Sequence, residues 1–245
     1  MLGLYTPVLL LQAFCVYHAY RNNVEQRWYW LILFFPLFGC IIYLVQNFNS
    51  ASTIKSLEEN VKAVVISNYK IEQLEKALRF SDSFKNKVNL ADEYVDVSRY
   101  DDAIPLYESC LQGFMSEDPS LRMKLLNAHF MNEDYGAAVQ YGDNLKSETT
   151  FKNSEVRVTY AWSIYQTGHA ALAETIFADM DKSFSNYYHK LEYCKFLIKT
   201  EKMELAREKL TELMQEFDHV KGPERRLNRE TFSQVKDLHA SYVRS

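Results

Sequence analysis

The sequence predicts an all-α protein, in which two apolar N-terminal segments precede an array of paired helices and a C-terminal helix. Three observations favour this fold class. Glycine and proline are scarce, with seven and five among 245 residues. Two long stretches near the N-terminus carry no charge, and farther on a pattern of small residues recurs every 33 to 35 residues. A turn-rich β architecture would need more glycine and proline than this chain has.

Charge is distributed unevenly along the chain. The net charge is −4 overall, but residues 1–49 carry +1, residues 50–220 carry −8 and residues 221–245 carry +3. Nucleic-acid-binding surfaces need clustered positive charge to neutralise phosphates, so an acidic body argues against such a surface. We therefore expect no nucleic-acid partner.

The first 50 residues predict a membrane anchor. Residues 1–20 and 28–54 contain no charged side chain, and the polar link "RNNVEQR" between them is short. Each stretch is long enough for a helix to cross roughly 30 Å of hydrocarbon. We therefore expect a two-helix transmembrane hairpin over residues 1–50, surrounded by membrane lipid. A cleaved signal peptide would need a basic start, which is missing here, and a buried soluble helix pair is the other alternative.

A family resemblance supports this anchor. The order "WYW" then "FFPLFGCIIYL", with Pro36, Gly39 and Tyr43 at those intervals, resembles the N-terminal two-helix module of cardiolipin synthases, the phospholipase D N-terminal domain. The resemblance covers about the first 50 residues. The catalytic signature of that family is absent, because Arg226 stands where an Asp is required after His219 and Lys221. A lipid-modifying enzyme is therefore disfavoured.

The remainder of the chain repeats itself. The segments "SRYDDAIPLYESCL", "NEDYGAAVQYGDNL", "TGHAALAETIFADM" and "EKMELAREKLTELM" align on one alanine each, at Ala103, Ala138, Ala173 and Ala206. A large residue, usually followed by a small one, precedes each alanine by about a dozen residues. This period and pattern resemble tetratricopeptide repeats, which are pairs of antiparallel helices. The resemblance implies an α-solenoid of about four helix pairs over residues 83–220. In the second unit, Leu126 and Gly142 depart from the pattern and predict looser packing.

Helices are also expected on both sides of the array. Residues 51–82 continue a helical pattern of apolar residues and predict a linker helix, and residues 221–245 predict a C-terminal capping helix after a Gly-Pro pair. Within the first repeat, Pro105 is compatible with a helix whose N-cap is Asp101, because the amide that it lacks then falls near the helix start.

No motif predicts chemistry. The chain has no HExxH, CxxC, GxxxxGK[ST] or GxGxxG pattern, and its six histidines show no metal-ligand spacing. The cysteines at positions 15, 40, 110 and 194 are interpreted as small core residues. We expect no enzyme activity, no cofactor and no metal site.

The repeat resemblance implies a binding groove along the first helix of each pair. We expect a protein or peptide partner to contact residues that this resemblance places there: Asn127, Phe130, Met131, Trp162, Tyr165, Gln166, Lys195, Ile198 and Lys199, with Asp92, Val95, Asp96, Met123, Val158 and Leu191 beside them. Aromatic residues, together with a few polar groups, suit a helix or extended peptide. Trp162 has an alternative role as a core residue.

The leading functional hypothesis is a non-enzymatic, membrane-anchored adaptor that holds a partner close to a bilayer. The expected location is a bacterial inner membrane, crossed twice, with the array in the cytoplasm. The alternative is an accessory subunit of a membrane enzyme or lipid-related complex, recognised through the hairpin. An oligomer or a larger membrane complex is compatible with either function.

Overall fold

The structure is a computed structural model that describes residues 6–21, 27–35, 38–40, 42–43, 67–182 and 186–243. It divides at residue 69 into an N-terminal unit and a C-terminal unit. Among the described residues every regular element is a helix, which confirms the all-α prediction. Residues 51–66 of the predicted linker helix, and the residues 22–26 of the predicted hairpin loop, lie outside the described residues.

The N-terminal unit contains a packed helix pair, α1 (Thr6–Arg21) and α2 (Arg27–Phe34). Gln12 Nε2 donates a hydrogen bond of 3.0 Å to the carbonyl of Ile32. His18 Nδ1 lies 2.8 Å from the hydroxyl of Tyr43, and the side chains of Cys15 and Cys40 are buried in the same small cluster. Local polar contacts therefore hold α1 against both α2 and the segment that follows it.

The prediction of a transmembrane hairpin, and of a multi-pass membrane location, is wrong. Among the described residues, no helix is both long enough and apolar enough to span a membrane. α1 has 16 residues and α2 has 8. At 1.5 Å per residue, the longer helix reaches only about 24 Å, against roughly 30 Å of hydrocarbon. α2 ends just before Phe35, the residue that precedes Pro36, and proline disfavours the helical conformation of the residue before it.

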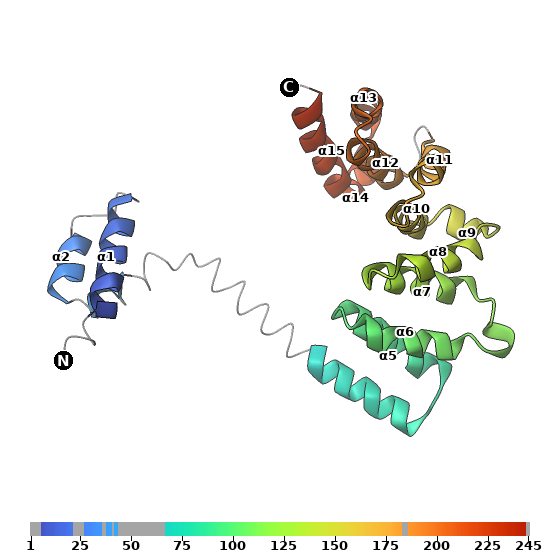
Figure 1. The fold of residues 1–245 in the computed structure, drawn as a ribbon, viewed down its shortest axis with the longest axis horizontal. Helices are drawn as coiled ribbons and strands as arrows, with labels where there is room; N and C mark the ends of the chain where they lie inside the picture. The colour runs from blue at the N-terminus through green and yellow to red at the C-terminus, as the bar shows by residue number, and fades with distance from the viewer. Residues whose placement is uncertain are drawn as a thin grey trace. The chain divides into compact units, whose positions relative to one another are not determined.

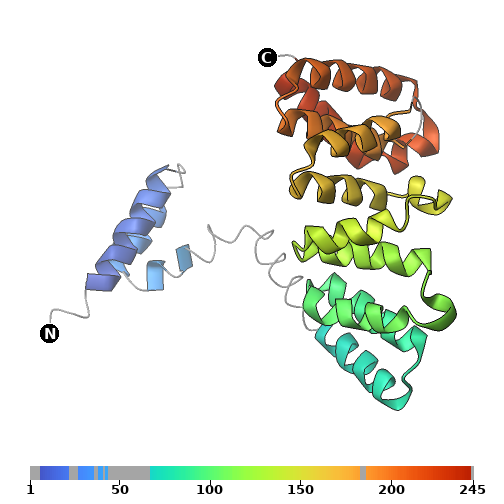
Figure 2. The same ribbon diagram turned by 45° about the vertical axis from the view of Figure 1, so that its right-hand side comes forward.

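The C-terminal unit is a solenoid of four helix pairs. The helices of each pair run antiparallel, and the pairs stack one after another along the unit (Figures 1 and 2). The pairs are α5 (Phe84–Asp96) with α6 (Tyr100–Cys110), α7 (Pro119–Met131) with α8 (Tyr135–Asp143), α10 (Val156–Gln166) with α11 (Ala170–Met180), and α12 (Tyr187–Lys199) with α13 (Met203–His219). Short helices η1 (Gly113–Met115) and α9 (Thr149–Lys152) lie in two connections between pairs. The predicted solenoid is therefore confirmed.

The four turns within the pairs share one geometry. Each turn has one residue with positive φ, at Ser98, Glu133, Gly168 and Glu201. The amide of the next residue bonds to a carbonyl five positions earlier, as from Arg99 to Tyr94 at 2.7 Å. This is the Schellman arrangement that ends a helix with its last carbonyls satisfied. These positions have the same 35, 35 and 33 residue spacing as the four alanines, all of which are fully buried.

One consequence of this turn concerns Pro105. α6 begins at Tyr100 with Arg99 as its N-cap, so the prediction of Asp101 as N-cap is wrong by two residues. The turn geometry at Ser98 decides where the helix starts. Pro105 therefore lies deeper inside α6 than expected, and it cannot donate a hydrogen bond to the carbonyl of Asp101.

Helices cover both ends of the solenoid. Residues 67–80 form a helix, from which Ile71, Leu74 and Leu78 pack onto the core of the first pair. At the other end, α14 (Gly222–Leu227) leads into α15 (Arg229–Tyr242), which packs against α12 and α13. α15 thus occupies the place that the first helix of a fifth pair would take.

Candidate functional site

The first helices of successive pairs contact one another and form one continuous surface. We name it the first-helix face: the half-buried and exposed side chains of α5, α7, α10 and α12, with α15 at its end. Lys124 of α7 donates to Asp92 of α5 at 2.6 Å, and α7 packs against α10. Hydrogen bonds between side chains then join α10 to α12 and α12 to α15.

The predicted site residues occupy this face at different depths. Asn127, Phe130, Trp162, Tyr165, Lys195 and Ile198 are half-buried, whereas Met131, Gln166 and Lys199 are exposed. Val158 and Leu191 are buried in the core, so these two side chains cannot contact a partner. The exposed residues are therefore the ones through which a partner would first contact the face.

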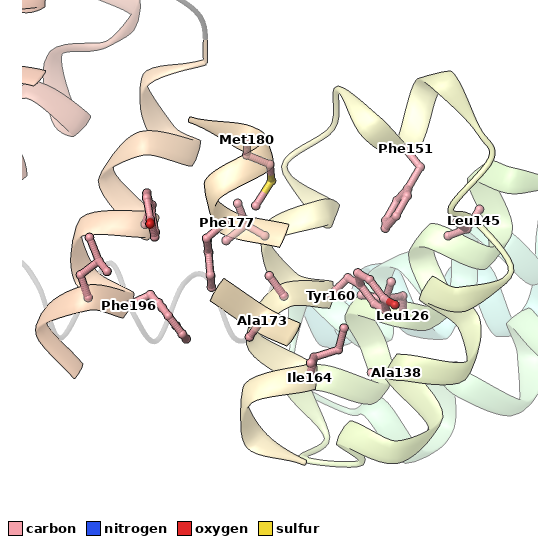
Figure 3. Packing of buried hydrophobic residues seen from close by; sticks show 14 of the residues in the cluster. Leu126, Ala138, Leu145, Phe151, Tyr160, Ile164, Ala173, Phe177, Met180 and Phe196 are labelled. Carbon is pink, nitrogen blue, oxygen red and sulfur yellow. The ribbon is translucent and has the colours of Figure 1, made fainter. Parts of the chain in front are cut away.

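Trp162 lies at the centre of an aromatic cluster. Its ring is 5.7 Å from that of Tyr165, 5.5 Å from that of Phe177 and 5.9 Å from that of Phe196. Phe177 and Phe196 are fully buried (Figure 3). One side of the indole therefore packs on the core, and the rest of the ring lies on the first-helix face. Trp162 is thus partly a core residue and partly a surface residue.

A chain of hydrogen bonds orients this tryptophan. The indole Nε1 donates to Glu192 Oε2 at 2.9 Å, and Lys195 Nζ donates to Glu192 Oε1 at 2.7 Å. Lys195 Nζ also donates to Gln234 Oε1 of α15 at 2.9 Å. The ammonium of Lys195 is therefore already engaged within the chain. These contacts hold the ring plane of Trp162 in one orientation.

Glu192 and Gln234 were not predicted from the sequence. Glu192 directly precedes the large and small pair of the fourth unit, where a polar residue on a buried helix face is a usable signal. Gln234 has no such signal, because no repeat pattern extends to α15. Its contact with Lys195 joins residues 39 positions apart.

A second group of polar residues lines a recess of about 400 Å³ beside α12 and α13. Lys190 and Lys209 face Asp181, Glu212 and Glu216 there, with Lys209 Nζ 2.9 Å from Asp181 and from Glu212. Burial lowers the pKa of Lys209, but the hydrogen bonds to these carboxylates outweigh it, and the pKa is raised above its usual range. The two ion pairs thus favour the protonated amine of Lys209, which is not nucleophilic.

Metal ligation is not supported by the part of the chain that the structure describes. Within it, no three His, Cys, Asp or Glu side chains gather closely enough to hold an ion. Cys110 and Cys194 are buried in separate clusters, and burial raises the pKa of the Cys194 thiol to about 12. Thiols of this kind are poor nucleophiles at neutral pH.

His189 makes the stability of the array depend on pH. Its Nε2 donates to the carbonyl of Ser154 at 3.0 Å, and burial lowers the pKa of its imidazole despite that bond. The unfolded chain therefore binds a proton that the folded chain excludes as pH falls below about 6.5. We expect the urea midpoint of the wild type to decrease between about pH 7 and about pH 5.5.

The matched test replaces this histidine. His189→Gln keeps an amide donor for Ser154 but cannot titrate, so the decrease in urea midpoint should be smaller than in the wild type. His169→Gln alters an exposed histidine and should leave the decrease unchanged. An equal decrease in His189→Gln and in the wild type would contradict the assignment.

The described array therefore defines a class, the α-solenoids built from helix pairs, with a polar-and-aromatic face along its first helices. No protein-family model matches the chain, including any for the cardiolipin synthase module, and no curated protein matches it. One similar solved structure is that of Naa15/Naa10 bound to HypK-THB, with 18% identity and a TM-score of 0.40. The match covers 97% of this chain and 34% of that chain, so this chain spans about a third of its length.

Proposed function

We propose that this chain is a non-enzymatic scaffold that binds a protein or peptide partner along the first-helix face. The observation that carries the proposal is the combination of an oriented aromatic ring on α10 and an exposed apolar side chain on the neighbouring first helix, α7. Trp162 is oriented by Glu192, and Met131 on the neighbouring α7 is 54% exposed. Oriented aromatic anchors lose little conformational entropy when a partner binds, and they dominate many interfaces.

The test must spare the core. Truncating Trp162 would disturb its packing on Phe177 and Phe196, so exposed positions are better probes. We expect Met131→Lys combined with Gln166→Lys to weaken partner binding at least tenfold, which is roughly 1.4 kcal/mol. Partners that crosslink to the wild-type face would be identified by mass spectrometry, and their affinity for purified variants measured by titration calorimetry.

A control is available on the other side of the array. Leu172 lies on α11, a second helix, and is 48% exposed, close to the exposure of Met131. Leu172→Lys combined with Gln140→Lys, at an exposed glutamine of the second helix α8, therefore introduces the same two charges without touching the first-helix face. Equal losses of affinity in both variants, or none in either, would refute binding along this face.

A second function is favoured by the N-terminal unit. Tyr17, Tyr20, Trp30, Phe34 and Phe38 on and after its helices are all at least half exposed. Exposed apolar patches of this kind mark surfaces that another protein covers. The alternative is thus an accessory subunit recognised through the α1–α2 pair. Replacing residues 1–50 with an unrelated segment would abolish that recognition but would leave binding through the first-helix face intact.

A further inference from the structure

A hollow of about 430 Å³ lies between the helix 67–80 and the first pair of the array. Its apolar lining comes from Leu78, Leu90 and Leu106, together with the ring of Pro105. Pro105 has no amide hydrogen, so its part of the wall offers no hydrogen-bond donor. The apolar part of the lining therefore suits an apolar side chain that enters from outside.

Acidic side chains surround this hollow. Glu75, Asp101 and Asp102 line it together with a single guanidinium, that of Arg79, which gives a net charge of −2. Each of these carboxylates accepts one side-chain hydrogen bond: Glu75 from the hydroxyl of Tyr94 at 2.9 Å, Asp101 from Asn132 at 2.9 Å and Asp102 from Arg99 at 2.7 Å. The side chain that enters should therefore be flanked by positive charge.

The opposite end of the same array presents such a side chain. Leu227, the last residue of α14, is 86% exposed. It follows Arg226 and lies two residues before Arg229, both of them exposed, and residues 221–230 hold four basic against two acidic side chains. This +2 segment matches the −2 lining of the hollow.

Contacts of Arg225 hold α14 against the solenoid. Arg225 Nη1 lies 3.4 Å from the carbonyl oxygens of Phe217 and Val220, and its guanidinium is 4.8 Å from the ring centroid of Phe232. The exposed leucine therefore projects from a held element, which lowers the entropy lost when it docks.

From this complementarity we propose that the chain associates head to tail with a second copy of itself, with Leu227 of one copy in the acidic hollow of the next. Within one copy the two surfaces lie at opposite ends of the solenoid, separated by the intervening pairs (Figure 2). They can therefore meet only between copies. A head-to-tail contact leaves one free end on each side, so further copies add until the rotation between copies closes a ring, or indefinitely where it does not. This proposal is independent of the first-helix face.

Charge reversal provides the test on the full-length protein. Arg226→Asp changes the tail segment from +2 to 0, and Asp102→Arg changes the lining of the hollow from −2 to 0. Each variant alone therefore lacks opposite charges at its two ends, so we expect its self-association to weaken at least tenfold in sedimentation velocity at about 100 µM. In an equal mixture, the +2 tail of the Asp102→Arg copy meets the −2 hollow of the Arg226→Asp copy, which is the wild-type pairing, so association should recover.

Recovery in the mixture also excludes misfolding as the cause. Lys152→Asp and Glu117→Arg reverse exposed charges away from both ends and should leave association unchanged. Added salt should weaken the wild-type association, because surface charges are screened beyond about 10 Å at roughly 0.1 M. A wild type that stays monomeric, or an association that neither reversal weakens, would overturn the proposal, and the hollow and the leucine would then serve other partners.

Discussion

Phe177→Ala should lower the free energy of unfolding of the array by about 3 to 5 kcal/mol, the range for truncating a fully buried phenylalanine. Phe177 has no exposed surface and lies between two repeats. Its ring is 4.9 Å from that of Phe196, 6.2 Å from that of Tyr193 and 5.5 Å from that of Trp162. The neighbouring rings are themselves held by hydrogen bonds or by packing, so the cavity cannot collapse.

The effect of Phe177→Ala extends beyond the third pair, α10 and α11, to the unfolding of the whole array. Solenoid stability is a sum of repeat terms and interface terms between neighbours. Loss of Phe177 weakens the interface between the third and fourth pairs, so urea unfolding should separate into two transitions. Leu172→Ala, five residues earlier on the same helix but 48% exposed, should change the free energy of unfolding by less than about 0.5 kcal/mol. A single unshifted transition in Phe177→Ala would contradict this account.

The repeat architecture was predictable because two independent constraints recur with one period. The close approach of helices requires a small residue, seen at Ala103 and its three counterparts, and the turn requires a left-handed residue at positions such as Ser98. The sequence indicates only the first of these constraints, because serine and glutamate do not signal a positive φ as glycine does at Gly168. Local requirements of this kind are visible in a single sequence.

The contacts that orient the candidate site were not predictable in the same way. The bond from Lys195 to Gln234 depends on α15 taking the place of another first helix, which no recurring alanine marks. The N-terminal prediction failed for a related reason. Hydropathy reports which residues avoid water but not where a helix ends, and the end of α2 at Phe34 leaves it with only eight residues.

Gly142 illustrates a departure from the repeat pattern that has a structural cause. The pattern calls for a large residue there, and its absence predicts loose packing. Instead, the ring of Tyr160 from the next pair fills the space. A Cβ at position 142 would overlap its ring atoms Cγ, Cδ2 and Cε2. Tyr160 is buried, and its hydroxyl donates to Asp143 Oδ1 at 2.6 Å. The second pair is thus completed by a side chain of the third.

Gly142→Ala should therefore destabilise the array by about 1 to 3 kcal/mol, although alanine favours helices more than glycine does. The added methyl group would displace a ring that is anchored at its hydroxyl. The control lies on the same helix: Gly136 has only Asp134 Oδ1 near its Cβ position, at 3.8 Å. Gly136→Ala should stabilise the array by about 0.5 to 1 kcal/mol. Urea denaturation would measure both, and midpoints that move in the same direction would contradict the role assigned to Tyr160.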